Sequence, residues 1–122
     1  MNKFSKRSLE QLSTCDQRLQ DLFTKVLQEM DCTIIEGHRG REKQNRMVEE
    51  GKSKVKWPRS KHNTLPSKAV DVMPYPIDWN DMERLQEFAS IVKKTAKRMN
   101  IKIKWGGDFE SFFDGPHWEL DE

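Results

Sequence analysis

Two long stretches with apolar residues at three- and four-residue intervals constrain this fold most, because each predicts an amphipathic helix that must bury one face. The first runs from about residue 8 to 30, with Ser8 as the expected cap, and the second from about 79 to 99, with Asp78 as the cap. The apolar positions are Leu9, Leu12, Leu19, Leu22, Phe23, Val26, Leu27 and Met30 in the first, and Met82, Leu85, Phe88, Ile91, Val92 and Ala96 in the second. Both helices need an apolar surface to pack against.

The segments between and after these helices have the composition of short strands. They are CTIIEG at 32–37, AVDVMP at 69–74, IKIKW at 101–105 and HWEL at 117–120. A further helix is predicted over REKQNRMVEEG at 41–51, because Gly51 suits the left-handed position that ends a helix. The order α-β-α-β-α-β-β predicts an α+β fold, with a small antiparallel sheet and flanking helices.

The length and charge of the chain narrow its class. Its 122 residues fit a single domain over residues 1–122. The 22 basic and 20 acidic residues give a net charge of +2, too small a bias to indicate nucleic acid by itself. No stretch resembles a signal peptide or a membrane span. We expect a monomer made in the cytoplasm without a signal peptide, with no membrane partner and with Cys15 and Cys32 as reduced, buried thiols.

The last strand carries a histidine in a pattern that separates two faces. Since side chains alternate along a strand, HWEL places His117 and Glu119 on one face, and Trp118 and Leu120 on the other. One face therefore belongs to the core, while the other is polar.

A carboxylate interrupts the strand AVDVM. Asp71 faces away from Val70 and Val72, and burying its charge is costly unless a cation or strong donors compensate. The alternative is an edge strand that leaves Asp71 in water. His62 lies in the loop before this strand, and together with Asp71 and His117 it makes a set sufficient for catalytic zinc, which takes three protein ligands. Spacing alone does not separate this set from a solvated loop histidine.

Two motifs sharpen this interpretation. The sequences SKHNTLPSKAVDV and DGPHWEL resemble the Ser-x-His…Ala-x-Asp…His-x-Glu-Leu pattern of the zinc D-Ala-D-Ala carboxypeptidase (VanY-like) family, which includes phage L-alanyl-D-glutamate endopeptidases. Upstream, EGHRGREKQN is similar to the family's Gly-x-Arg segment with a glutamine five positions on. The resemblance implies a Hedgehog/D-Ala-D-Ala peptidase-like fold. The interval NTLPSK is longer than the family's usual linker, and HRGRE lacks the usual Ser or Thr after the arginine.

The resemblance also implies residue roles. His62, Asp71 and His117 match the zinc ligands, and Asp114 matches the catalytic acid/base. Glu119 is the rival for that role, or else a partner that orients a ligand histidine.

Further residues match the upstream motif. Arg39 is expected to hold a substrate carbonyl or carboxylate, or the developing oxyanion, although surface solvation is the alternative. Gln44 would be its helix-borne hydrogen-bond partner, or an ordinary polar position. Ser60 is expected to position the loop or His62 and not to act as a nucleophile. His38 should point away from the site.

The expected function is a zinc peptidase that hydrolyses peptidoglycan stem peptides, preferably an L-alanyl-D-glutamate endopeptidase acting as a phage endolysin. It would be made in the host cytoplasm and act on the bacterial cell wall. The alternatives are a D-Ala-D-Ala carboxypeptidase, a non-catalytic wall-binding module, or a nucleic-acid-binding domain that uses the basic loop 52–68 with Trp57. Trp105 and Trp118 are expected in the core, and Trp79 at the start of the third helix.

Overall fold

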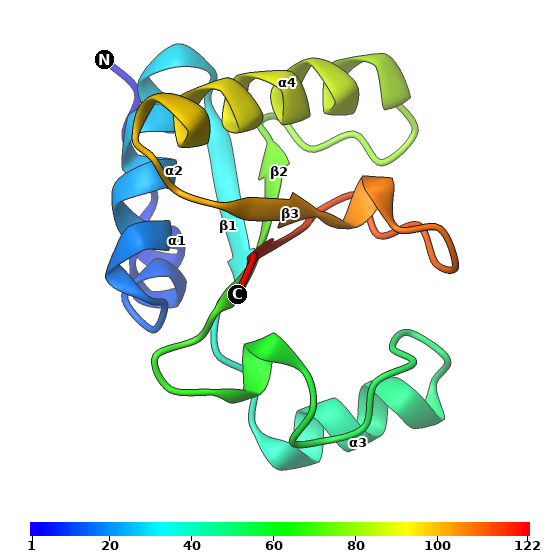
Figure 1. Cartoon of the computed structure of the whole chain (residues 1–122). Helices are drawn as coiled ribbons and strands as arrows, with labels where there is room; N and C mark the ends of the chain where they lie inside the picture. Colours follow the sequence, from blue (N-terminus) through cyan, green and yellow to red (C-terminus); the bar gives the residue numbers. More distant parts are fainter.

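The computed structural model describes residues 1–122 as four helices around a four-stranded sheet (Figure 1). The helices are α1 (Lys6–Leu12), α2 (Gln17–Glu29), α3 (Arg41–Glu49) and α4 (Met82–Arg98), and the strands are β1 (Cys32–Glu36), β2 (Ala69–Pro74), β3 (Ile103–Trp105) and β4 (His117–Leu120). Short 3-10 turns span Lys61–Asn63 and Gly106–Asp108. The strand order is β1-β2-β4-β3 and every pair is antiparallel, which confirms the predicted α+β fold with a small antiparallel sheet.

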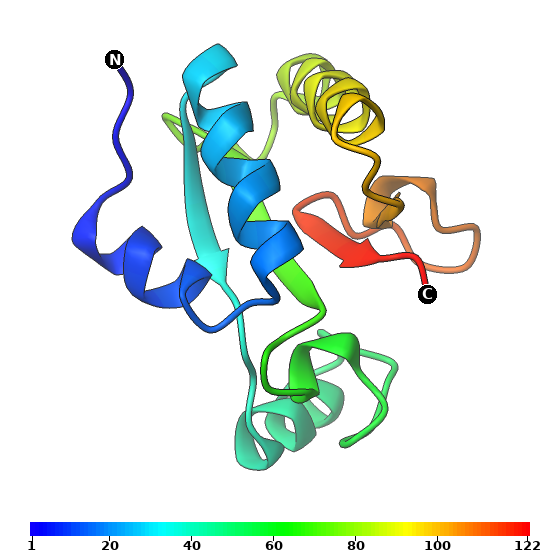
Figure 2. The same ribbon diagram turned by 60° about the vertical axis from the view of Figure 1, so that its left-hand side comes forward.

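The two faces of the sheet differ in kind. Helices α2 and α4 cover one face, as the two ribbon views show (Figures 1 and 2). Trp118 of β4 is fully buried there and meets Phe23 of α2 edge to face, at 6.3 Å between ring centres. We call this part, namely α2, α4 and the sheet face that they cover, the helical body. The opposite face carries Asp71 and His117, so the predicted alternation along β2 and β4 is confirmed.

The strand β2 lies between β1 and β4, so the alternative of an edge strand for Asp71 is wrong. A bulge between Ile34 and Glu36 shifts the register of β1. Ile34 therefore pairs with Val72 on the apolar face, whereas Glu36 pairs with Asp71 on the polar face. The bulge brings a second carboxylate to the side of Asp71.

The first helical segment is two helices and not the single helix predicted over 8–30. The chain turns between Leu12 and Gln17, where Asp16 caps α2 by accepting from the backbone of Arg18. The cap of α1 is Ser5 and not Ser8, whose buried hydroxyl instead accepts from the backbone N–H of Ile34. Short polar side chains compete for backbone groups, which ends the helix despite the continuing apolar period.

The second long helix begins later than predicted. Helix α4 starts at Met82 with Asp81 as its cap, while Asp78 accepts from the backbone of Asn80 in the preceding turn. Trp79 therefore precedes the helix, and its expected place at the helix start is wrong; it is 60% exposed. Trp105 and Trp118 are buried as predicted.

Helix α3 and the loop that follows it form a separate layer below the sheet (Figure 1), which we call the polar lobe, residues 40–66. Gly51 has a φ of 75° after α3, which confirms the predicted left-handed helix end. The only residue that α3 buries is Gln44, a polar one. None of the helices combines the length and the apolar composition needed to span a membrane.

Candidate metal centre

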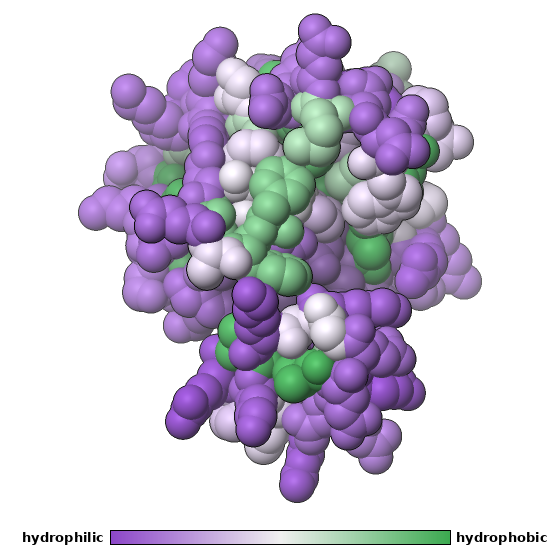
Figure 3. Space-filling model, turned by 90° about the vertical axis from the view of Figure 1, so that its right-hand side faces the viewer, coloured by the Kyte–Doolittle hydropathy of each residue, from purple (hydrophilic) through white to green (hydrophobic).

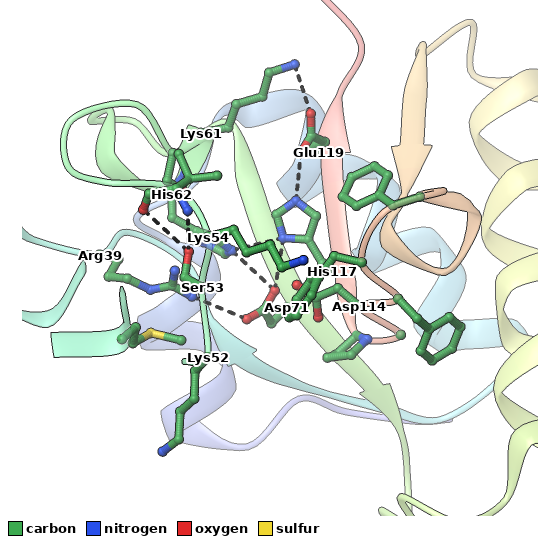
Figure 4. A pocket seen from close by; sticks show the side chains of 18 of the residues that line it. Arg39, Lys52, Ser53, Lys54, Lys61, His62, Asp71, Asp114, His117 and Glu119 are labelled. Carbon is green, nitrogen blue, oxygen red and sulfur yellow. Dashed lines mark hydrogen bonds and ion pairs between the residues drawn. The ribbon is translucent and has the colours of Figure 1, made fainter. Parts of the chain in front are cut away.

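Three side chains from distant parts of the sequence meet on the polar face of the sheet (Figure 4). Asp71 of β2 pairs directly with His117 of β4, and His62 comes from the 3-10 turn at the edge of the polar lobe. The His62 Nε2 atom lies 3.2 Å from Asp71 Oδ1 and 3.2 Å from His117 Nδ1, and His117 Nδ1 lies 3.4 Å from Asp71 Oδ1. The structure thus brings together the three residues that the motifs singled out.

The outer nitrogens of both imidazoles are already hydrogen-bonded. His62 Nδ1 lies 2.8 Å from the carbonyl oxygen of Gly37, and His117 Nε2 lies 2.8 Å from Glu119 Oε1. Both partners are acceptors, so each outer nitrogen must carry the hydrogen. In the neutral imidazoles, the inner nitrogens therefore present lone pairs toward each other and toward the Asp71 carboxylate. Three acceptors that converge in a buried place require a proton or a metal cation between them.

The titration of the cluster reflects this crowding. Burial opposes the ionisation of Asp71, but the neighbouring charges and hydrogen bonds of His62 and His117 hold the pKa of that carboxyl well below its usual range. Burial also opposes a charge on His117, yet its hydrogen bonds to Asp71 and Glu119 raise its pKa to about 9. Without a metal ion, a proton on His117 therefore supplies the positive charge that the three acceptors need.

The geometry of the cluster fits a tetrahedral ion. Ligand atoms about 2.0–2.1 Å from a tetrahedral zinc ion lie about 3.3–3.4 Å apart, and the three separations here are 3.2, 3.2 and 3.4 Å. Two imidazoles and one carboxylate are donors that zinc accepts. Hydrogen bonds to the outer histidine nitrogens are the usual support of such ligands.

Asp114 lies in the turn before β4 and lines the cavity beside the cluster. Its carbonyl oxygen accepts from the backbone N–H of His117 at 3.1 Å, and its own N–H donates to Gly106 at 3.0 Å. A Cβ atom at Gly106 would lie 2.2 Å from that carbonyl, so the close approach requires glycine. Burial and the charge of Asp71 raise the pKa of the Asp114 carboxyl.

Glu119 touches the outer side of His117 and is held in turn by Lys61, whose Nζ lies 3.1 Å from Glu119 Oε2. Although burial opposes its ionisation, these hydrogen bonds lower the pKa of Glu119. The arrangement is that of a carboxylate orienting a ligand histidine.

A buried ion-pair network supports the cluster from the side of β1. The guanidinium of Arg39 is buried; it donates to Glu36 Oε1 at 2.7 Å and to Gln44 Oε1 at 3.0 Å, and its Nη2 lies 3.6 Å from Asp71 Oδ2. Lys43 also pairs with Glu36. Sequence patterns did not single out Glu36, because alternation along β1 puts it on the apolar face and the bulge turns it to the other.

The remaining predicted residues lie around this centre. Ser60 accepts from the backbone N–H of His62 at 3.2 Å, while its own N–H donates to Asn63 Oδ1 at 3.1 Å, so a capping box closes the N-terminal end of the turn that presents His62. His38 does not line the cavity; its backbone N–H donates to the Thr14 hydroxyl at 2.8 Å.

The cluster opens into a cavity of about 780 Å³ between the polar lobe and the sheet. Figure 3 shows apolar side chains gathered on this side of the molecule, with hydrophilic ones around them. The two walls of the cavity differ in charge and polarity, since the polar lobe contributes basic side chains and the opposite wall is largely apolar. The main wall residues are Lys52, Lys54, Arg59 and Lys61 on the first side, and Trp79, Met82, Phe109, Phe112 and Phe113 on the second.

The chain is similar to known proteins along nearly its whole length. Residues 1–120 match the family model described as "Phage L-alanyl-D-glutamate peptidase". The chain is 32% identical over 135 aligned residues to the L-alanyl-D-glutamate peptidase of Escherichia phage T5, covering 97% of each protein. It superposes with a TM-score of 0.83 and 28% identity on the crystal structure of the Serratia marcescens L-Ala D-Glu endopeptidase ChiX, covering 98% of this chain and 91% of that one.

Proposed function

The chain belongs to the phage L-alanyl-D-glutamate peptidase family, whose members cleave peptidoglycan, and we propose that it does so with a zinc ion held by His62, Asp71 and His117. The observation that carries the proposal is the convergence of three acceptor atoms, one nitrogen from each imidazole and one oxygen of Asp71. The other nitrogen of each imidazole is already hydrogen-bonded. A divalent cation would satisfy all three acceptors at once.

Bound zinc would polarise the scissile carbonyl group and make a water molecule nucleophilic at neutral pH. Neighbouring residues of the chain hold the three metal-binding side chains in place. Gly37 and Glu119 fix the two imidazole rings, and Arg39 lies beside the outer oxygen of Asp71. Each ligand is therefore oriented before a metal ion arrives.

Asp114 is our candidate for the acid/base. Its raised pKa suits a group that must both accept and release a proton. It takes a proton from the water that adds to the L-Ala carbonyl carbon and passes it to the leaving nitrogen of D-Glu, so the C–N bond breaks to give a carboxylate and an amine. Glu119 is the weaker candidate, because both of its carboxylate oxygens are engaged by His117 and Lys61.

Arg39 acts mainly as a positioning residue in this proposal. Its guanidinium is committed to Glu36 and Gln44 and faces Asp71, which leaves little of it for a substrate carboxylate. Gln44 supports Arg39, and Ser60 supports the turn of His62.

The biological setting that we propose is that of an endolysin, made in the host cytoplasm as a monomer and acting on the bacterial cell wall. A D-Ala-D-Ala carboxypeptidase is the alternative within the chemistry of this site, and the products distinguish the two.

Mass spectrometry of purified muropeptides digested by the protein tests the proposal. We expect new L-Ala carboxyl ends and D-Glu amino ends, loss of this activity after chelation, and its return with added zinc. Release of terminal D-Ala alone would identify a carboxypeptidase, and activity that survives chelation would contradict the zinc site.

A further inference from the structure

The basic side chains that line the cavity are not equally available to a substrate. They are Arg39, Lys52, Lys54, Arg59 and Lys61. Arg39 is buried against Glu36, and Lys61 pairs with Glu119 while donating to the carbonyl of Leu120 at 2.6 Å. These two cations belong to the support of the metal centre.

Two of the remaining cations have no acidic partner. Lys52 pairs with Glu50 at 3.3 Å, whereas Lys54 and Arg59 form no ion pair. An unpaired cation on the wall of a substrate cavity attracts anionic groups.

Lys54 is the one of these two that reaches across the cavity. Its ammonium lies 5.3 Å from the ring centre of Phe112 and 3.5 Å from the carbonyl oxygen of Ser111, both on the opposite wall. A hydrogen bond of 3.5 Å is at the limit of the useful range, and cation–π contacts at exposed sites are weak. A carboxylate would be a stronger partner and would displace both contacts.

The backbone on both sides of Lys54 is anchored to the metal centre. The side-chain nitrogen of Gln44 donates to the Ser53 hydroxyl at 3.0 Å and to the carbonyl of Val55. The side-chain oxygen of the same Gln44 accepts from Arg39, which faces Asp71. The residues before and after Lys54 therefore keep a defined position relative to the metal ligands, while its side chain extends across the cavity with only the two weak contacts.

The substrate of the proposed reaction carries an anionic group close to the scissile bond. A glutamyl residue has two carboxyl groups, and only one of them continues the peptide. The other remains a free carboxylate a few bonds from the nitrogen that leaves. In a substrate whose free glutamyl carboxylate is converted to a carboxamide, this charge is absent while the shape stays nearly the same.

We propose that Lys54 binds this free carboxylate of the D-glutamyl residue and thereby makes the enzyme prefer substrates with a carboxylate there over those with a carboxamide. The inference rests on the proposed function and deepens it. It assigns to Lys54 the selection of the residue on the leaving side of the bond, a role separate from metal binding.

Two synthetic stem peptides that differ only in this carboxylate or carboxamide test the inference, with kcat/KM measured for each. We expect the wild type to prefer the carboxylate peptide by about tenfold or more, the usual strength of a charged hydrogen bond. Lys54→Met should lower kcat/KM for the carboxylate peptide by about the same factor, mainly through KM. It should leave the carboxamide peptide and the zinc content unchanged, and Lys54→Arg should restore part of the preference.

Lys56→Met is the matched control, because Lys56 is an exposed lysine of the same loop that does not line the cavity; it should behave as wild type. Loss of the preference in Arg59→Met but not in Lys54→Met would overturn the assignment. Equal losses on both peptides in Lys54→Met would overturn it too, as would a wild type that cleaves both peptides equally. A wild type that cleaves neither peptide would instead contradict the proposed function.

Discussion

The helical body and the polar lobe face each other across the cavity, but different forces stabilise them. Helix α2 buries five apolar side chains and α4 buries a comparable apolar face, whereas α3 buries Gln44 alone. The helical body gains its stability from apolar area removed from water. The polar lobe instead depends on hydrogen bonds among groups that are costly to leave unpaired.

The residues of the metal centre come from both the sheet and the polar lobe. The sheet provides Asp71 and His117 on the face opposite the helical body, while the polar lobe brings His62 and Lys54 on a turn and a loop. Gln44 connects the polar lobe to the metal centre, since its side chain bonds to Arg39, which faces Asp71, to Asn63 beside His62, and to the loop that carries Lys54. Damage to the helical body should therefore lower stability most, and damage to the polar lobe should lower zinc affinity and activity most.

A core truncation in α4 should give the largest stability effect. Phe88 is fully buried, and Phe88→Ala should lower the free energy of unfolding by about 3–5 kcal/mol. Zinc affinity of the fraction that remains folded should change little. Denaturant unfolding with a zinc titration measures both; a stability loss below about 1 kcal/mol would contradict the division, because surface substitutions already reach about half of that.

Gln44→Ala should reverse this pattern. It removes the acceptor of Arg39 and Asn63 and the donor to Ser53, so we expect a loss of about 1–3 kcal/mol in unfolding free energy together with a marked fall in zinc affinity and kcat/KM. Asn45→Ala, at the exposed neighbouring position of α3, is the matched control. If both variants kept wild-type zinc affinity, the polar lobe would not depend on Gln44.

Glu119→Gln tests how Glu119 supports the metal ligand His117 on β4. The amide oxygen still accepts from His117, but without a negative charge, so zinc affinity should fall by about 10- to 100-fold. Competition with a zinc-binding dye provides the measurement. A complete loss of turnover at saturating zinc would contradict the orienting role and favour Glu119 over Asp114 as the acid/base.

Zinc affinity should also depend on pH, and the change per pH unit should be the smallest of the effects predicted here. The pKa of His117 is raised from 6.5 to about 9 without metal, so zinc must displace a proton below that pH. Affinity should rise by up to about tenfold per pH unit toward pH 9. The metal-free protein shows the opposite sign: the stabilisation by protonated His117 is complete below pH 6.5 and is lost as pH rises through about 9. An affinity that does not change with pH would contradict this.

Much of the sheet and of the metal cluster could be predicted from local patterns. A period of two along β2 and β4 placed Asp71 opposite the valines and His117 beside Glu119, and both placements follow from the geometry of any strand. The meeting of His62 with these strands, however, came from family motifs and not from spacing.

The features that the sequence did not predict depend on long-range structure that leaves no local pattern of residues. Glu36 reaches Asp71 only through a bulge, and Trp79 precedes α4 and lines the cavity because the helix begins at Met82, later than predicted. The family motif pointed to Gln44 as the partner of Arg39, but its complete burial requires the polar lobe to fold over it. Such long-range arrangements leave no periodic trace in the sequence.

The most direct test of the metal centre is a calorimetric zinc titration of metal-stripped wild type, His62→Ala, His117→Ala and the control His38→Ala. The wild type and His38→Ala should each bind one zinc ion per chain, while the other two variants should lose this binding although they remain folded by circular dichroism. Unchanged zinc stoichiometry and affinity in His62→Ala and His117→Ala would show that the cluster is not the metal site.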